Sequence, residues 1–125
     1  MQNNAITWFE IPAANLDRAS GFYENILNNK LHRESMGPHD LAVFPYDQTS
    51  GTGGCVMQSD ALQPSANGSV VYLNTGKEFD AVLSRVERAG GRVALAKTAL
   101  PGDMGFFAHI IDSEGNRVGL HGLAG

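Results

Sequence analysis

The first half of the chain alternates apolar and polar residues and then changes to a helical spacing. Residues 5–11 alternate, which predicts a strand, and Pro12 ends it. Apolar residues then recur at intervals of three and four over 16–27, directly after Asn15, a residue type that commonly caps the first turn of a helix. Three short strand patterns follow, separated by turn-forming segments, at 30–35, 41–46 and 53–58.

The second half predicts the same elements in the same order. A strand over 69–74 precedes a helix over 77–91, in which Gly90 stands at the position of a C-cap. The apolar helical positions of the first half map onto those of the second with one constant shift of 63 residues, as from Leu16 to Phe79. Three further strand patterns follow at 92–98, 105–112 and 117–122.

These repeated patterns predict an α+β fold made of two tandem β-α-β-β-β units within one domain, residues 1–125. The units cover about 5–59 and about 68–122, and a polar, proline-containing segment joins them. A four-stranded sheet with one helix has only one face covered. Two such units can therefore curl their mixed sheets into a trough with the helices outside. Alternation along each strand then separates residues that pack against a helix from residues that line the trough.

Composition and charge exclude several classes of function. The chain has 125 residues, which suffices for one domain with a core, since 42% of its residues are apolar. Its net charge of −4 and the lack of a basic run disfavour nucleic acid as a partner. No apolar stretch approaches the roughly 20 residues of a membrane span. The N-terminus shows no signal-peptide pattern, and Cys55 is the only cysteine, so we expect a soluble, cytoplasmic protein.

Three segments carry a resemblance to a known superfamily. They are "NLDRASGFYENIL", "EFDAVLSRVERAGGRV" and "AHIIDSEGNRVGL". Together with the element order, they make the chain similar to the vicinal oxygen chelate superfamily, which includes glyoxalase I, bleomycin-resistance proteins and extradiol dioxygenases. The third segment resembles the closing hairpin of that superfamily, with Ser113 in place of the usual proline. Because the fold hosts lyases, dioxygenases, epimerases and binding proteins, the resemblance alone does not fix the function.

The resemblance also implies where a divalent metal would bind. Catalytic members use four inward His or Glu side chains on the first and last strands of each unit. Carried over by position, these sites fall on Trp8, Gln58, Val70 (or a neighbour of Val70) and Gly119. One amide oxygen among four positions does not make a metal site, since a metal needs several convergent donors. We therefore expect no metal and no other cofactor.

The pairing of residues across the predicted last hairpin indicates which residues face the trough in place of the metal ligands. A turn centred on Glu114 pairs residues whose numbers sum to 228, which sets His109 opposite Gly119 and Phe107 opposite His121. Cys55 has the opposite parity to Gln58, so we expect Cys55 to pack against a helix. The expected ligand-binding residues share an aromatic or polar character suited to a small molecule. They are Trp8, Glu10, Gln58, Tyr72, Phe107, His109 and His121.

Several of these residues allow two interpretations. Trp8 either walls an open pocket by stacking or fills the space that the metal site leaves. His109 either serves as a general base or fills space beside a glycine, and His121 is either a ligand contact or a partly exposed side chain. Glu10 and His109 are the catalytic candidates if the protein is an enzyme.

The sequence favours a metal-free small-molecule binding protein with an aromatic trough. The alternative is a lyase or dioxygenase-type enzyme, either with a relocated metal site or with acid–base chemistry by Glu10 and His109. A third reading is an interaction domain whose cavity is filled by aromatic side chains. We also expect a homodimer, because small members of the superfamily usually pair and because each sheet has edges that pairing can cover.

Overall fold

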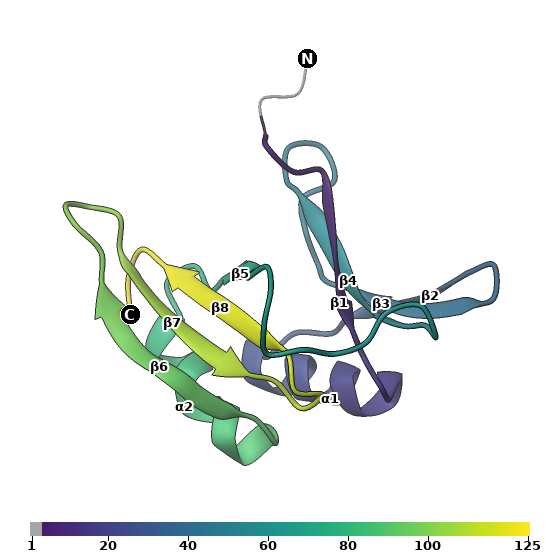
Figure 1. Cartoon of the computed structure of the whole chain (residues 1–125). Coiled ribbons are helices and arrows are strands. Elements are labelled where there is room, and N and C mark those ends of the chain that lie inside the picture. The colour runs from purple at the N-terminus through teal and green to yellow at the C-terminus, as the bar shows by residue number, and fades with distance from the viewer. Residues whose placement is uncertain (1–3) are drawn as a thin grey trace.

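The computed structural model describes residues 4–125, which form two units of identical element order (Figure 1). The first unit consists of β1 (Trp8–Pro12), α1 (Leu16–Leu27), β2 (His32–Met36), β3 (His39–Val43) and β4 (Gly53–Gln58). The second unit consists of β5 (Tyr72–Asn74), α2 (Phe79–Ala89), β6 (Arg92–Ala99), β7 (Phe106–Ile111) and β8 (Arg117–Gly122).

Each unit contributes a four-stranded mixed sheet. The strand orders are β1-β4-β3-β2 and β5-β8-β7-β6, so the first strand of each unit pairs in parallel with the last. The other neighbours are antiparallel. The predicted α+β fold with two β-α-β-β-β units is therefore confirmed. The two sheets do not close, and Figure 1 shows them diverging from a shared pair of helices.

Both helices begin and end close to where the sequence predicts. The Asn15 side chain accepts a hydrogen bond from the Arg18 N–H, which satisfies a donor in the first turn of α1. Gly90 ends α2 in the left-handed conformation with φ of 113°, which a glycine adopts without steric penalty. Neither helix within residues 4–125 is long and apolar enough to cross a membrane.

One core spans both units, because α1 and α2 pack against each other beneath the sheets. Phe22, Tyr23 and Ile26 from α1 and Phe79 and Val86 from α2 are buried in this core. The strands add every second side chain to it, from Phe9 and Ile11 in β1 to Val118 and Leu120 in β8. The alternate side chains of the strands face the opposite, concave side of each sheet.

Several predicted strand boundaries differ from the structure by two or three residues, and two of the differences have a clear physical reason. The strand predicted over 69–74 begins only at Tyr72, because the Arg117 N–H that would pair with this segment donates to the Ser65 carbonyl instead. The predicted break between the second and third strands is a tight hairpin. Gly37, with φ of 63°, makes the turn between β2 and β3.

The turn between β7 and β8 ties the second unit to α1 of the first. The Tyr23 hydroxyl donates a 2.6 Å hydrogen bond to the buried Asp112 carboxylate. Glu114, in the same turn, accepts from the backbone N–H groups of Ala14 and Asn15 and from the Arg18 guanidinium. The turn therefore holds the N-terminus of α1 and fixes how the two units meet.

We predict that Glu114→Gln destabilises the protein by about 1.5–3 kcal/mol at neutral pH, the range for hydrogen bonds to a charged group. Burial acts to raise the pKa of Glu114, but hydrogen bonds from Arg18, Asn15 and Ser113 outweigh it and lower the pKa below its ordinary value of 4.5. The ionised form is therefore favoured by folding, and its contribution is fully present above pH 4.5 and is lost as the pH falls through the lowered folded pKa.

Urea unfolding of the two proteins at several pH values checks this, with the exposed Glu87→Gln as the control. We expect the stability gap to narrow in acid for Glu114→Gln, and no gap for the control. A gap independent of pH would contradict the assignment of this stability to the carboxylate charge.

Candidate ligand-binding site

The concave face of the first sheet carries Trp8 and Glu10. Their neighbours Phe9 and Ile11 pack into the helix-side core, so alternation directs Trp8 and Glu10 to the opposite face. Both side chains are exposed. The Trp8 ring lies edge-on to the Tyr46 ring, with ring centroids 6.2 Å apart. The Tyr46 ring in turn lies over Gly53, where an added Cβ would come within 2.5 Å of it.

The predicted orientations of Gln58 and Cys55 are wrong. Val56 packs in the helix-side core, whereas Cys55 and Met57 pack with Leu41 and Val43 on the other face of β4. Alternation therefore puts Gln58 on the helix side, where its Oε1 accepts a 2.8 Å hydrogen bond from the Leu16 N–H. The amide caps a helix and does not face the trough.

Cys55 lies on the concave face next to Trp8 and Glu10. Burial raises the pKa of the Cys55 thiol to about 11, and the nearby Glu10 carboxylate adds to this, while a hydrogen bond with Trp8 acts in the opposite direction. The thiol is therefore protonated at neutral pH, which disfavours a role as a nucleophile.

On the second sheet, β7 and β8 pair in the register that the sequence predicts from a turn centred on Glu114. His109 lies opposite Gly119, and Phe107 lies opposite His121. Tyr72 of β5 pairs with Gly119 on the other side of β8. A Cβ on Gly119 would approach the Tyr72 ring to 2.3 Å, so the absence of a side chain at Gly119 lets that ring lie across β8.

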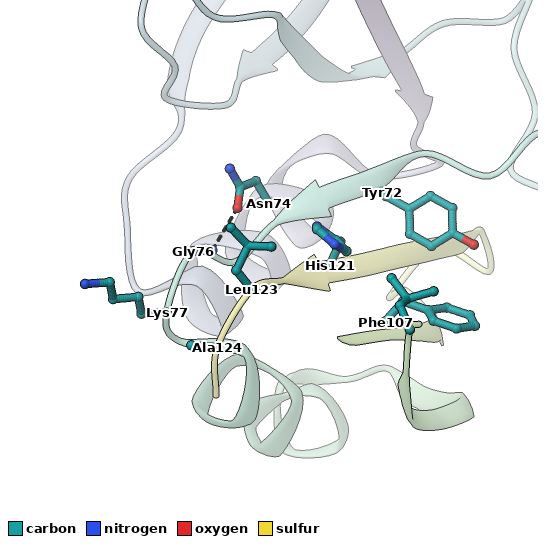
Figure 2. Close-up of a pocket in the computed structure, with 9 residues that line it drawn as sticks. Tyr72, Asn74, Gly76, Lys77, Phe107, His121, Leu123 and Ala124 are labelled. Atoms are coloured by element: carbon teal, nitrogen blue, oxygen red, sulfur yellow. Dashed lines mark hydrogen bonds between the residues drawn. The ribbon is translucent and has the colours of Figure 1, made fainter. Parts of the chain in front are cut away.

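A pocket of about 740 Å³ opens on the concave face of the second sheet. Figure 2 shows Tyr72, Phe107 and His121 along one side, with the chain end at Leu123 and Ala124 facing them. Most of the lining is aromatic or aliphatic. The His121 Nε2 lies 2.8 Å from the Met104 carbonyl, which can only accept, so the ring donates there and its Nδ1 is left as an acceptor.

A chain of hydrogen bonds runs along the open side of the same sheet. Arg117 Nη1 lies 3.1 Å from His109 Nδ1, and His109 Nε2 lies 2.7 Å from the Tyr72 hydroxyl. Burial, and then the positive charge of Arg117, lower the pKa of His109 below its ordinary 6.5. The imidazole is therefore neutral at neutral pH.

The structure does not gather all the predicted site residues into one cavity. Tyr72, Phe107 and His121 line the 740 Å³ pocket. Trp8 lines a separate pocket of about 250 Å³ with Tyr46 and His32. Glu10 and Arg117 line a third, of about 180 Å³, between the edges of the two sheets, and Gln58 lines a fourth. The predicted site residues are thus divided among separate hollows. A further hollow of about 520 Å³ is lined from both units, by Tyr46 and Gly53 of the first and by Tyr72 and Asn74 of the second.

Sequence reasoning missed two groups of site residues. Arg117 lies two residues before Gly119 on the same strand, so strand alternation could have predicted that it faces the concave side. Leu100, Leu123 and Ala124 lie outside the strands, where no periodicity marks them, and only the fold brings them to the pocket.

A family model for the glyoxalase/bleomycin resistance protein/dioxygenase superfamily matches residues 5–120 of the chain. The chain belongs to this superfamily. A comparison with curated proteins found no significant match. Among solved structures, a glyoxalase/bleomycin resistance protein from Albidiferax ferrireducens superposes with a TM-score of 0.71 at 13% identity, covering 95% of this chain and 98% of that one.

Two other superfamily structures show the same fold. Glyoxalase I from Zea mays superposes with a TM-score of 0.67 at 21% identity over 94% of this chain, which spans 45% of the maize chain. The fosfomycin resistance protein FosX from Listeria monocytogenes gives a TM-score of 0.65 at 15% identity, covering 97% of this chain and 94% of that one. At these identities the likeness shows the fold alone.

The side chains of this superfamily member do not fit the superfamily's metal. The positions at which the resemblance implies metal ligands hold Trp8, Gln58, Val70 and Gly119, and the Gln58 amide oxygen accepts from the Leu16 N–H on the helix side. These four positions do not supply the convergent donors that a divalent ion needs. Glu10 and His121 also lie on the concave faces, but they line different pockets. The Tyr72 ring also covers the space into which a side chain at Gly119 would extend. Within residues 4–125 no three His, Cys, Asp or Glu side chains come together as a metal-binding group.

We predict that Trp8→Ala lowers the free energy of unfolding by less than about 3 kcal/mol, the lower end for truncating a buried large aromatic side chain. Trp8 is 38% exposed and contacts Tyr46 edge-on, so its truncation removes a smaller buried fraction than truncation of a fully buried aromatic residue does. Phe79→Ala, at a fully buried position, is the reference and should cost about 3–5 kcal/mol. Urea unfolding at equal protein concentration measures the free energy of unfolding of both variants and of the unmodified protein. Equal losses for the two variants would identify Trp8 as a core plug.

Proposed function

We propose that this superfamily member is a metal-free small-molecule binding protein whose ligand occupies the pocket on the concave face of the second sheet. The observation that carries the proposal is the Tyr72 ring lying over Gly119. This arrangement occupies the superfamily's metal position and at the same time forms a wall of the 740 Å³ pocket.

The size and lining of the pocket support this function. Its volume lies within the range of about 300–1,000 Å³ that is typical of small-molecule sites. Phe107 and Tyr72 present aromatic surface, and Leu123 faces them across the opening (Figure 2). A few polar groups, among them His121 and Asn74, interrupt this apolar lining, which matches sites that bind by apolar contact and orient by hydrogen bonds.

The geometry gives less support to an acid–base enzyme. Both His109 nitrogens already have partners, so no lone pair of the ring is free to accept a substrate proton. Glu10 lies on the other sheet and lines a different pocket from Tyr72 and Phe107. The names of the neighbours, glyoxalase I and fosfomycin resistance protein, indicate only that this fold serves small molecules.

The working form that we propose is a cytoplasmic homodimer. Trp8 and Tyr72 do not line a common pocket within one chain, although Tyr46 and Tyr72 both line a hollow of about 520 Å³. Each sheet also has two edge strands without a sheet partner, β1 and β2 in the first sheet and β5 and β6 in the second. A second copy could cover edges and bring the Trp8 face of one chain against the Tyr72 face of the other.

We predict that the protein binds the neutral fluorescent probe N-phenyl-1-naphthylamine saturably and that Leu123→Glu weakens this binding at least about tenfold. A carboxylate at the mouth of an apolar pocket must be desolvated when the probe enters, which opposes binding. Leu123 is 67% exposed, so the substitution should leave folding intact. Fluorescence titration in the presence of a chelator measures the affinity.

Met36→Glu is the matched control, because Met36 is 61% exposed on β2 and lines none of the pockets described above. This control should bind the probe as the unmodified protein does. Absence of saturable binding, or equal weakening in the two variants, would contradict the proposed site.

We predict that sedimentation velocity at micromolar concentration shows a dimer. The physical reason is the coverage of exposed strand edges and exposed apolar side chains such as Trp8 and Tyr72. A single monomeric species over the whole concentration range would reject the dimer and, with it, a site shared between two chains.

A further inference from the structure

The direction of the hydrogen bonds between Arg117, His109 and Tyr72 is fixed by chemistry. A guanidinium has donors and no acceptor, so Arg117 Nη1, 3.1 Å from His109 Nδ1, must donate to it. His109 Nδ1 is then unprotonated, and a neutral imidazole carries its single proton on Nε2. Nε2 therefore donates to the Tyr72 oxygen, 2.7 Å away.

This direction leaves the Tyr72 hydroxyl proton without a partner among residues 4–125. The hydroxyl already accepts from His109, and no other hydrogen bond of the Tyr72 side chain is present. Because Tyr72 is 48% exposed and its ring lines the pocket, this proton points to the open, concave side of the sheet. Figure 2 shows the hydroxyl at the end of the ring that lies farthest from Leu123. The pocket thus has a largely apolar body, with the Tyr72 hydroxyl as a donor at its edge and Asn74, Lys77 and His121 as further polar groups.

Resting on the proposed function, we propose that the pocket selects a planar apolar ligand that carries a hydrogen-bond acceptor oxygen, and that the Tyr72 hydroxyl is the donor that recognises this oxygen. Arg117 and His109 are positioning residues, since they act through Tyr72. The ligand class is an aromatic ketone or a similar carbonyl compound, whose acceptor oxygen would face the Tyr72 hydroxyl.

The neutral state of His109 supports this orientation. Burial and the charge of Arg117 disfavour the imidazolium, which would carry a proton on Nδ1 and face the Arg117 guanidinium with a second donor. The positive charge of Arg117 has no carboxylate partner within ion-pair distance among residues 4–125. The guanidinium is thus free to polarise the imidazole and, through it, the Tyr72 hydroxyl.

The test compares two probes of similar shape, 2-acetylnaphthalene and 2-ethylnaphthalene, by displacement of N-phenyl-1-naphthylamine. Only the first has an acceptor oxygen. We expect the ratio of their affinities, acetyl to ethyl, to fall by about 3- to 10-fold in Tyr72→Phe, the effect of one neutral hydrogen bond. Ser84→Ala, which removes an exposed hydroxyl from α2 on the far side of the sheets, is the control and should keep the ratio of the unmodified protein.

A ratio unchanged by Tyr72→Phe, with both probes binding, would overturn acceptor recognition and leave the proposed function standing. Failure of all three naphthalene compounds to bind would overturn the proposed function itself. Nitrogen-15 NMR of the His109 ring, recorded above pH 6.5, tests the positioning residues separately. We expect the Nε2–H tautomer in the unmodified protein and a mixture of tautomers in Arg117→Met. A predominant Nδ1–H tautomer in the unmodified protein would overturn the assigned direction.

Discussion

The buried turn between β7 and β8 is the constraint on which the rest of the structure depends. Asp112 accepts hydrogen bonds from the Tyr23 hydroxyl, from the Asn116 side chain and from the backbone of its own turn, so its charge is satisfied inside the core. Burial and the carboxylate of Asp112 raise the pKa of Tyr23, which therefore stays protonated and continues to donate. Glu114 adds the capping of α1, so one turn closes a hairpin and joins the two units.

The same turn determines the chemistry of the open face. By fixing the β7–β8 register, it places His109 beside Gly119 and Phe107 beside His121, with Arg117 two residues closer to the turn than Gly119. Gly119 then leaves room for the Tyr72 ring, and the ring brings its hydroxyl to His109. The Tyr72 ring in this way covers Gly119, a position at which the resemblance implies a metal ligand. This arrangement depends on the absence of a side chain at Gly119 as much as on the presence of the Tyr72 ring.

Local patterns predicted most of the fold, because each element depends on residues close in sequence. Asn15 and Gly90 marked helix ends, and the β7–β8 register followed from a five-residue turn whose geometry is local. Gln58 was misplaced because β4 pairs in parallel with β1 across a long connection, so no short turn sets its parity. The division of the trough into separate pockets, and the closure of one of them by Leu123, depend on how the two sheets diverge, and strand periodicity carries no information about that.

The central claim is that aromatic side chains have replaced the superfamily's metal in a binding protein. Trp8, Gln58, Val70 and Gly119, at the positions where the resemblance implies ligands, offer no usual set of donors for a divalent ion. Elemental analysis of the purified protein at neutral pH, after incubation with nickel, zinc, iron and manganese and removal of unbound ions, tests this most directly. The account predicts far less than one equivalent of any of these metals per chain. A stoichiometry near one metal per chain would contradict it.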